Sequence, residues 1–285
     1  MSGKLGVYLR LGRVSNLPTV WTNTLAGALL GGGGGVLESG LGKVVGLAGT
    51  MSLFYVGGMF LNDAFDREID AKERPERPIP KGDVTAREVF SVGFGALGGG
   101  IGLLYWQAGI LAAIFGAMLA GNIVLYDAWH KKNPLSPVLM GGCRVFVYLT
   151  AAVAMGSLNI AVLAGAGALF AYLIGLTYTA KMEGKSGAAL WPLVFLAVPF
   201  LKEAPSAWRG VVPALVYAGF LGLVVWAVWL VREKKAIGKA IVALLAGISL
   251  LDALVLAGAG HSAAALAAML GFFATRALQR WVAGT

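Results

Sequence analysis

Long apolar runs separated by short polar stretches dominate the pattern along this chain. The short run at 187–201 contains Pro192 and Pro199, so we expect it to be tilted, kinked or re-entrant. Most of the other runs have the roughly 20 residues that an α-helix needs to cross a bilayer. The pattern therefore predicts an all-α fold, a polytopic transmembrane helical bundle, with residues 1–285 forming a single integral-membrane domain. The runs fall at about 17–37, 44–64, 87–106, 108–128, 136–156, 160–180, 187–201, 211–231, 238–258 and 262–282.

Composition supports the membrane assignment. The chain is 58% hydrophobic and only 13% charged, whereas a soluble domain carries about 25% charged residues. The one cysteine, Cys143, excludes an intrachain disulfide and any multi-cysteine metal site. The net charge of +9 is typical of basic loops on the cytoplasmic side, and we expect no nucleic-acid partner.

Basic residues are distributed unevenly between the loops. With the N-terminus inside and ten spans, 19 of the 23 basic residues fall on the inner side, while Lys43, Lys202 and Arg209 fall outside and Arg144 lies within a span. Positive residues concentrate on the cytoplasmic side of membrane proteins. The charge pattern therefore predicts an integral protein of a prokaryotic cytoplasmic membrane with both termini in the cytoplasm.

The densest group of charges follows the second apolar run. Asn62, Asp66 and Asp70 recur every four residues, and Asp63 lies three before Asp66, so on a helix these side chains share one face. Three carboxylates on one face repel each other unless a divalent cation binds between them. An ordinary solvated loop of mixed charge is the alternative, but such a loop does not need acids in helical register directly after an apolar span.

A basic, proline-rich tail follows the carboxylates. Pro75, Pro78 and Pro80 end any helix there. Acids beside a basic loop suit a ligand made of Mg²⁺ and diphosphate, because carboxylates hold the metal while Arg and Lys hold phosphate oxygens. The sequence therefore predicts a site for such a ligand at the cytoplasmic mouth of the bundle. The basic residues of the tail and the preceding stretch are Arg67, Lys72, Arg74, Arg77 and Lys81.

The end of the fourth run, from Tyr126 to Lys132, has two interpretations. Trp, Tyr and Lys at this position form an ordinary interfacial anchor. Alternatively, Lys131 or Lys132 holds a diphosphate and Asp127 is an extra ligand of a metal or a water. His130 is interpreted as a solvated side chain.

Several polar residues lie inside predicted spans. Arg144 is expensive in lipid, so it should face an acid or a polar cavity; the alternatives are a structural pair with Asp127 and a role in binding an anionic ligand. Asn23 and Asn122 are amides of the kind that join helices by hydrogen bonds, and a site role for Asn23 is the less favoured alternative. Asp252 is an isolated acid, with Ser249 one turn before it.

At these residues the chain resembles the UbiA superfamily of intramembrane prenyltransferases. The resemblance is carried by Asn62-Asp63-x-x-Asp66-x-x-x-Asp70 and by the segment Arg74-Pro75-Glu76-Arg77-Pro78-Ile79-Pro80-Lys81-Gly82. Tyr126 and the Lys131-Lys132 pair are similar to the family's tyrosine and basic pair. The Gly-Gly-Cys-Arg span and the helix around Asp252 are similar to the EboC-like subgroup.

The resemblance implies a bundle of helices around a central cavity that opens to lipid and to the cytoplasm. It implies Mg²⁺-dependent transfer of an isoprenoid chain from a prenyl diphosphate to a hydrophobic or aromatic acceptor, with membrane lipid as the surrounding medium. Family members commonly have nine spans, so the expected number here is nine to ten. They usually carry a second aspartate motif after the sixth span, which Thr177 to Lys185 lacks. A transporter of an anionic small molecule and a catalytically altered lipid-binding protein stay as alternatives.

The expected roles follow from this hypothesis. Catalysis and metal binding fall to Asp63, Asp66 and Asp70, with Asn62 orienting a carboxylate or a water. Glu183 or Asp127 is the candidate to replace the missing acids. An allylic cation would be shielded by the rings of Phe60, Tyr148 or Tyr178. The candidates for substrate binding are Arg67, Arg77, Lys131, Lys132 and Arg144 on the phosphates, and Tyr126, Tyr178 and Asn23 elsewhere in the cavity.

Overall fold

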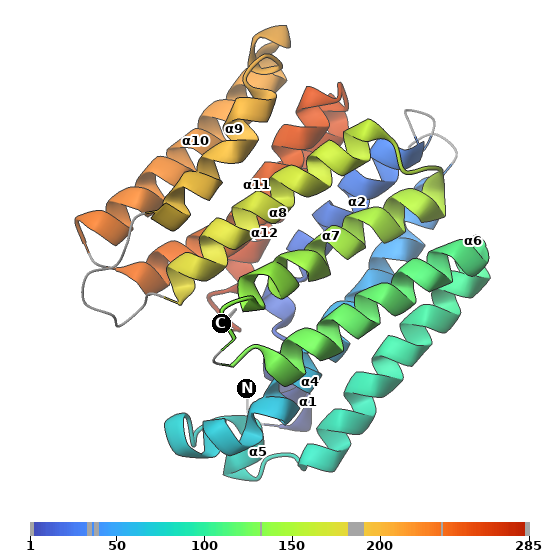
Figure 1. Cartoon of the computed structure of the whole chain (residues 1–285), viewed down its shortest axis with the longest axis vertical. Helices are drawn as coiled ribbons and strands as arrows, with labels where there is room; N and C mark the ends of the chain where they lie inside the picture. The colour runs from blue at the N-terminus through green and yellow to red at the C-terminus, as the bar shows by residue number, and fades with distance from the viewer. Residues whose placement is uncertain are drawn as a thin grey trace.

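The computed structural model describes residues 3–32, 36, 40–131, 133–181, 191–234 and 236–282. It is a bundle of helices, with no β-strand in these ranges (Figure 1). The prediction of an all-α bundle is confirmed. The first half contains α1 (Lys4–Leu11), the 3₁₀-helix η1 (Val14–Asn16), α2 (Leu17–Gly32), α4 (Leu41–Glu73), α5 (Pro78–Lys81), α6 (Ala86–Trp129) and α7 (Ser136–Met155). The second half contains α8 (Ile160–Ala180), η2 (Trp191–Ala197), α9 (Val198–Glu203), η3 (Ala207–Arg209), α10 (Val211–Arg232), α11 (Ile237–Gly258) and α12 (Ser262–Leu278).

Six of the described helices are long and apolar enough to cross a membrane. One of them, α6, covers both the third and the fourth apolar runs because it bends at Gly109, whose φ of 81° lies in the left-handed region that favours glycine. The two arms of α6 lie side by side (Figure 1), and an added Cβ at Gly100 or at Gly116 would contact the ring of Phe54. The bend therefore returns the chain to the same surface of α4, and α6 accounts for two of the nine to ten predicted spans.

The seventh apolar run is irregular, as its prolines predict. In its described part, η2 is followed directly by the short helix α9. Trp191 packs on the ring of Tyr178 at the end of α8, and the carboxylate of Glu203 lies directly against Gly258 at the end of α11. This segment therefore runs from one end of the bundle to the other.

The beginning and the end of the described chain meet at one end of the bundle. Gln279, just after α12, donates from Nε2 to Oδ1 of Asn16 in η1 over 3.1 Å. Figure 1 shows α1 and α5 at the same end. The core is centred on α11, which packs against α2, α8, α10 and α12 and is buried along nearly its whole length.

Glycines allow α2 and α7 to approach each other closely. A Cβ added at Gly27 would collide with the backbone oxygen of Tyr148, and one added at Gly31 would lie 2.7 Å from Cα of Ala152. Small residues permit such backbone contacts between membrane helices. The 42 glycines of the chain thus include several that set the distance between helices.

We expect Gly27→Ala to lower the free energy of unfolding by about 1–3 kcal/mol, because the added methyl group forces α2 away from α7. Gly121→Ala is the matched control, since a Cβ there meets nothing within 4 Å. Thermal unfolding of the purified variants in detergent measures the difference. Equal midpoints for the two variants would show that the α2–α7 contact tolerates a methyl group.

Candidate active site

The acidic residues occupy the last four turns of α4, where the helix continues beyond its apolar part. Asn62, Asp63, Asp66 and Asp70 are buried, with exposed fractions of 7%, 7%, 4% and 2%. They share one face of the helix, as their spacing predicts. The helix ends at Glu73, two residues before Pro75. A regular helix, and not a loop, therefore holds the acidic face in place.

Two arginines from outside α4 bind this face. Arg77 donates from Nη1 to Oδ1 of Asp63 at 3.2 Å and to Oδ2 of Asp70 at 2.8 Å. Arg13 donates from Nη2 to Oδ1 of Asp63 at 3.1 Å and to Oδ1 of Asn62 at 3.2 Å. The proline-rich tail turns back toward α4 and places Arg77 beside the acidic face. The short helix α5 begins directly after Arg77 and ends at Gly82, whose φ is 84°.

The C-terminal end of α6 covers the other side of the acidic face. His130 Nε2 and Lys131 Nζ each lie 3.4 Å from Oδ2 of Asp66. The ring of His130 stacks on Tyr126 with the centroids 4.9 Å apart. Asn62 donates from Nδ2 to Oδ1 of Asp127 over 3.2 Å. Residues of the fourth apolar run and of the acidic stretch thus form one cluster.

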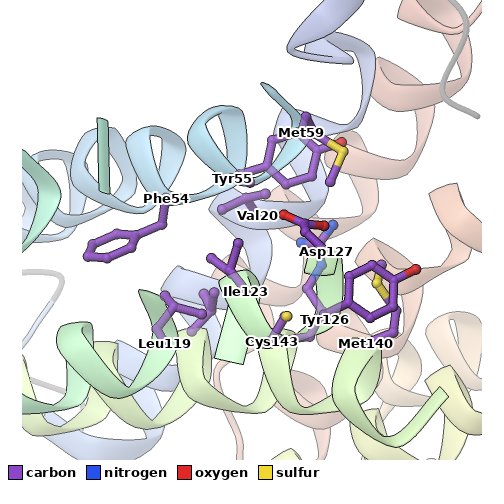
Figure 2. A pocket seen from close by; sticks show the side chains of 13 residues that line it. Val20, Phe54, Tyr55, Met59, Leu119, Ile123, Tyr126, Asp127, Met140 and Cys143 are labelled. Atoms are coloured by element: carbon purple, nitrogen blue, oxygen red, sulfur yellow. The ribbon is translucent and has the colours of Figure 1, made fainter. Parts of the chain in front are cut away.

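A pocket lies next to this cluster, between α2, α4, α6 and α7 (Figure 2). It encloses about 490 Å³ of space, part of it open to the outside. Asp127 and Arg144 are the charged residues among its described lining, and the rest of the wall is mainly apolar. The pocket is therefore suited to an apolar ligand with a polar end near the carboxylates. Its lining residues are Val20, Phe54, Tyr55, Gly58, Met59, Leu119, Ile123, Tyr126, Asp127, Met140, Cys143, Arg144 and Val147.

The aromatic wall differs from the one expected from depth in the spans. Phe54, Tyr55 and Tyr126 line the pocket, whereas Phe60 packs edge-on against Tyr8. Phe60 and Tyr148, two of the rings expected to shield an allylic cation, are not among the residues that line this pocket, because helical rotation and not depth decides which side a residue presents.

Arg144 does not form the pair with Asp127 that was one expectation. It donates from Nη1 to Oδ1 of Asn23 at 3.1 Å and from Nη2 to Thr19 at 3.0 Å. Asn23 in turn donates to Oδ2 of Asp252 at 2.7 Å. The guanidinium of Arg144 and the carboxylate of Asp252 are therefore joined through the amide of Asn23, and their opposite charges compensate each other across α2.

Asp252 is fully bonded on both oxygens. Thr22 donates to Oδ2 at 2.6 Å, and the hydroxyl of Tyr148 donates to Oδ1 at 2.6 Å. Together with the contact from Asn23, these bonds link α2, α7 and α11. Asn23 and Tyr148 thus act in the structure as members of this network.

Two further predicted site residues, Arg67 and Tyr178, make their contacts outside the cluster. Arg67 donates to the carbonyl of Ala64 and to Glu68 and lies over the ring of Phe90. Tyr178 donates from its hydroxyl to the carbonyl of Pro134 over 3.0 Å. Lys132 and Glu183 lie outside the described residues.

Two members of the cluster were not singled out from the sequence. Arg13 was counted only as a loop charge, and His130 was interpreted as solvated. Arg13 has a φ of 42°, an uncommon left-handed conformation for a residue other than glycine, at the start of η1. No periodicity connects it with residues fifty positions away, so only the tertiary fold reveals the contact. His130 had a weak signal, since it is one helical turn after Tyr126 and next to Lys131.

The donor atoms fit Mg²⁺ that is shared with a phosphate ligand. Mg²⁺ prefers oxygen ligands, keeps several waters and is usually held by one or two carboxylates plus substrate phosphates. In the described ranges, no three Asp, Glu, His or Cys side chains gather closely enough to hold a metal ion by themselves. However, Oδ2 of Asp127 is buried and has no hydrogen-bond partner there. One or two of the carboxylates of Asp63, Asp66 and Asp127 could therefore supply ligands to a metal whose other ligands are waters and the oxygens of a diphosphate.

Curated proteins are similar to part of this sequence. A stretch of 134 residues is 36% identical to digeranylgeranylglyceryl phosphate synthase of Ignicoccus hospitalis and covers 47% of this chain and 42% of that protein. The chain thus spans about half the length of the curated relatives it matches, or less.

Solved structures extend the likeness to nearly the whole chain. A structure that concerns digeranylgeranylglyceryl phosphate synthase in membranes superposes with a TM-score of 0.66 at 22% identity, over 91% of this chain and 98% of that one. A UbiA homologue from Archaeoglobus fulgidus bound to GPP and Mg²⁺ gives a TM-score of 0.55 at 14% identity, over 93% and 99%. At these identities the likeness shows the fold alone.

The model of the UbiA prenyltransferase family matches residues 20–283. This match includes the acidic end of α4, the end of α6 and the pocket between them. The protein is therefore an integral membrane protein that belongs to the UbiA prenyltransferase family.

Proposed function

We propose that this protein transfers an isoprenoid chain from a prenyl diphosphate to a lipid-soluble or aromatic acceptor within the membrane, and that it requires Mg²⁺. The observation that carries the proposal is a group of buried, cation-paired carboxylates on α4 whose neighbour Asn62 bonds Asp127, a residue that lines an apolar pocket. Such a site accepts a molecule that is highly charged at one end and apolar along its length. The relatives' name makes geranylgeranyl diphosphate and an isoprenoid glyceryl phosphate the first substrates to test.

The basic residues of the cluster would bind the diphosphate of the donor. Arg13, Arg77 and Lys131 already lie at the carboxylates, and donor binding would let them contact phosphate oxygens as well. Asp63 and Asp66 would hold Mg²⁺, which would supply a Lewis acid that neutralises charge on the phosphates. As the bond between C1 of the donor and oxygen breaks, the electron pair leaves with the diphosphate, and these cations stabilise the charge that develops.

The pocket would protect the resulting allylic cation. The rings of Tyr55 and Tyr126 line it, and aromatic faces stabilise a cation without reacting with it as water does. The acceptor then forms the new bond to C1 and loses a proton. Because basic residues predominate in the loops at this end, we propose that the mouth of the pocket and both termini face the cytoplasm.

Asp66→Ala should abolish transfer, because the carboxylate contacts both His130 and Lys131 and faces the proposed metal position. Purified protein, radiolabelled geranylgeranyl diphosphate, Mg²⁺ and an extract of isoprenoid lipids give the assay, with release of diphosphate as a second readout. Asp83→Asn is the control, since Asp83 lies at the same end of the bundle but pairs with Lys81 on the surface. Activity retained in Asp66→Ala would remove the acidic face from the mechanism, and solute flux without diphosphate release would favour the transporter.

Arg13→Gln and Arg77→Gln should each raise the KM for the prenyl diphosphate about tenfold or more, because a hydrogen bond to a charged group contributes about 1.5–3 kcal/mol. Arg10→Gln serves as the comparison, since Arg10 pairs only distantly with Asp83 among the described residues. Initial rates at varied donor concentration measure the effect. A KM for the two variants within twofold of that of Arg10→Gln would show that these arginines only neutralise the acidic face.

A further inference from the structure

Asp127 differs from every other carboxylate of the cluster. It lies in the last turn of α6, is 3% exposed and lines the pocket. Its Oδ1 accepts from Asn62, whereas its Oδ2 is buried without a hydrogen-bond partner among the described residues. Burying such a carboxylate oxygen costs free energy of folding, because the oxygen loses its hydrogen bonds to water and gains none from the protein. Some further group must therefore compensate this oxygen when the protein works.

The neighbouring carboxylates show what compensation looks like. Asp63 and Asp70 are bonded by Arg77, and Asp66 is contacted by His130 and Lys131. Asp252, deeper in the membrane, has no direct ion pair, but both of its oxygens accept hydrogen bonds. Asp127 is thus the buried aspartate with an open oxygen in the described part of the chain.

The position of Asp127 favours a cation as the missing partner. Burial disfavours a charge on Asp127, and the like charges of Asp66 and Asp63 add to this effect while the charge of Arg13 opposes it, so a further cation at Oδ2 would stabilise the ionised carboxylate. Figure 2 shows Asp127 projecting from α6 toward Tyr55 and Met59 of α4, across the pocket. Asp127 links the acidic face to the apolar pocket, since it accepts from Asn62 and lines the pocket, and binding of a cation at its free oxygen would not require breaking the ion pairs of Asp63, Asp66 and Asp70.

We propose that Asp127 is a ligand of Mg²⁺ and supplies a carboxylate oxygen to it from the end of the fourth span. Asn62 is the positioning residue, because its Nδ2 holds Oδ1 of Asp127 and leaves Oδ2 free, while its own Oδ1 accepts from Arg13. The inference rests on the proposed function only for the identity of the metal's second partner, a diphosphate.

Binding of Mn²⁺, a spectroscopic substitute for Mg²⁺, tests the assignment without catalysis. The free Mn²⁺ signal in electron paramagnetic resonance is followed as detergent-solubilised protein is titrated, with and without inorganic pyrophosphate. Asp127→Asn keeps the size of the side chain and an oxygen for Asn62, but removes the charged ligand. We expect its Kd for Mn²⁺ in the presence of pyrophosphate to rise about tenfold or more, while the surface variant Asp83→Asn binds as the unaltered protein does.

A second measurement guards against misfolding. In EDTA, Asp127→Asn should have a higher Tm than the unaltered protein, because it no longer buries a carboxylate among like charges, and added Mn²⁺ with pyrophosphate should stabilise it less. Asp127→Glu keeps the charge and displaces it by one methylene group, so its Kd should lie between the two.

The outcomes separate this inference from the proposed function. A Kd of Asp127→Asn for Mn²⁺ within twofold of that of the unaltered protein would overturn the metal assignment. This result is also expected if Oδ2 of Asp127 carries a proton instead of binding a metal. The proposed prenyl transfer would not be affected by it and could still be measured. Binding of Mn²⁺ that depends on Asp127 in a protein that transfers no prenyl group would support the metal site and reject the enzymatic proposal. An unaltered protein that binds no Mn²⁺ with pyrophosphate would overturn the inference outright.

Discussion

Compensation of buried charge at the end of α4 determines how the rest of this structure is arranged. A carboxylate that leaves water needs a partner close by, because its attraction to distant charges does not replace its hydration. Three segments provide partners for the acidic face: Arg13 before η1, Arg77 before α5, and His130 with Lys131 after α6. Each of these contacts ties a different part of the chain to α4. The charges that make the site thus also hold the helices around its mouth.

A second polar network operates deeper in the bundle and has a different character. Arg144, Asn23 and Asp252 form a chain of hydrogen bonds in which nearly every oxygen is accounted for. Such saturated networks specify which helices meet and in which rotation, since any other pairing leaves a charge in lipid. Asp127 differs from Asp252, because its Oδ2 has no hydrogen-bond partner among the described residues. Asp252 therefore stabilises the fold, whereas Asp127 is the residue that we infer to bind a ligand.

Much of this could be predicted from the sequence, because the relevant signals are local. The lengths of the apolar runs gave the helices, and the spacing from Asn62 to Asp70 gave a shared buried face. The structure did not test the roles of these residues in catalysis, which stay predictions. Contacts across long separations were not predictable: Arg13 lies fifty residues from Asp63, and nothing in the sequence pattern relates them. The rotation of the helices about their own axes was not predicted either. Tyr55 lines the pocket, whereas Tyr148 does not and donates instead to Asp252.

The bend at Gly109 has a consequence for how the protein is made. The two arms of α6 are joined by a change of direction at one glycine, with apolar residues on both sides and no polar linker between them. A nascent chain therefore has no hydrophilic segment to translocate at this point, and the two crossings would partition into the bilayer together as a preformed hairpin. The orientation of this hairpin as a unit is then set by the basic residues of the loops that flank it.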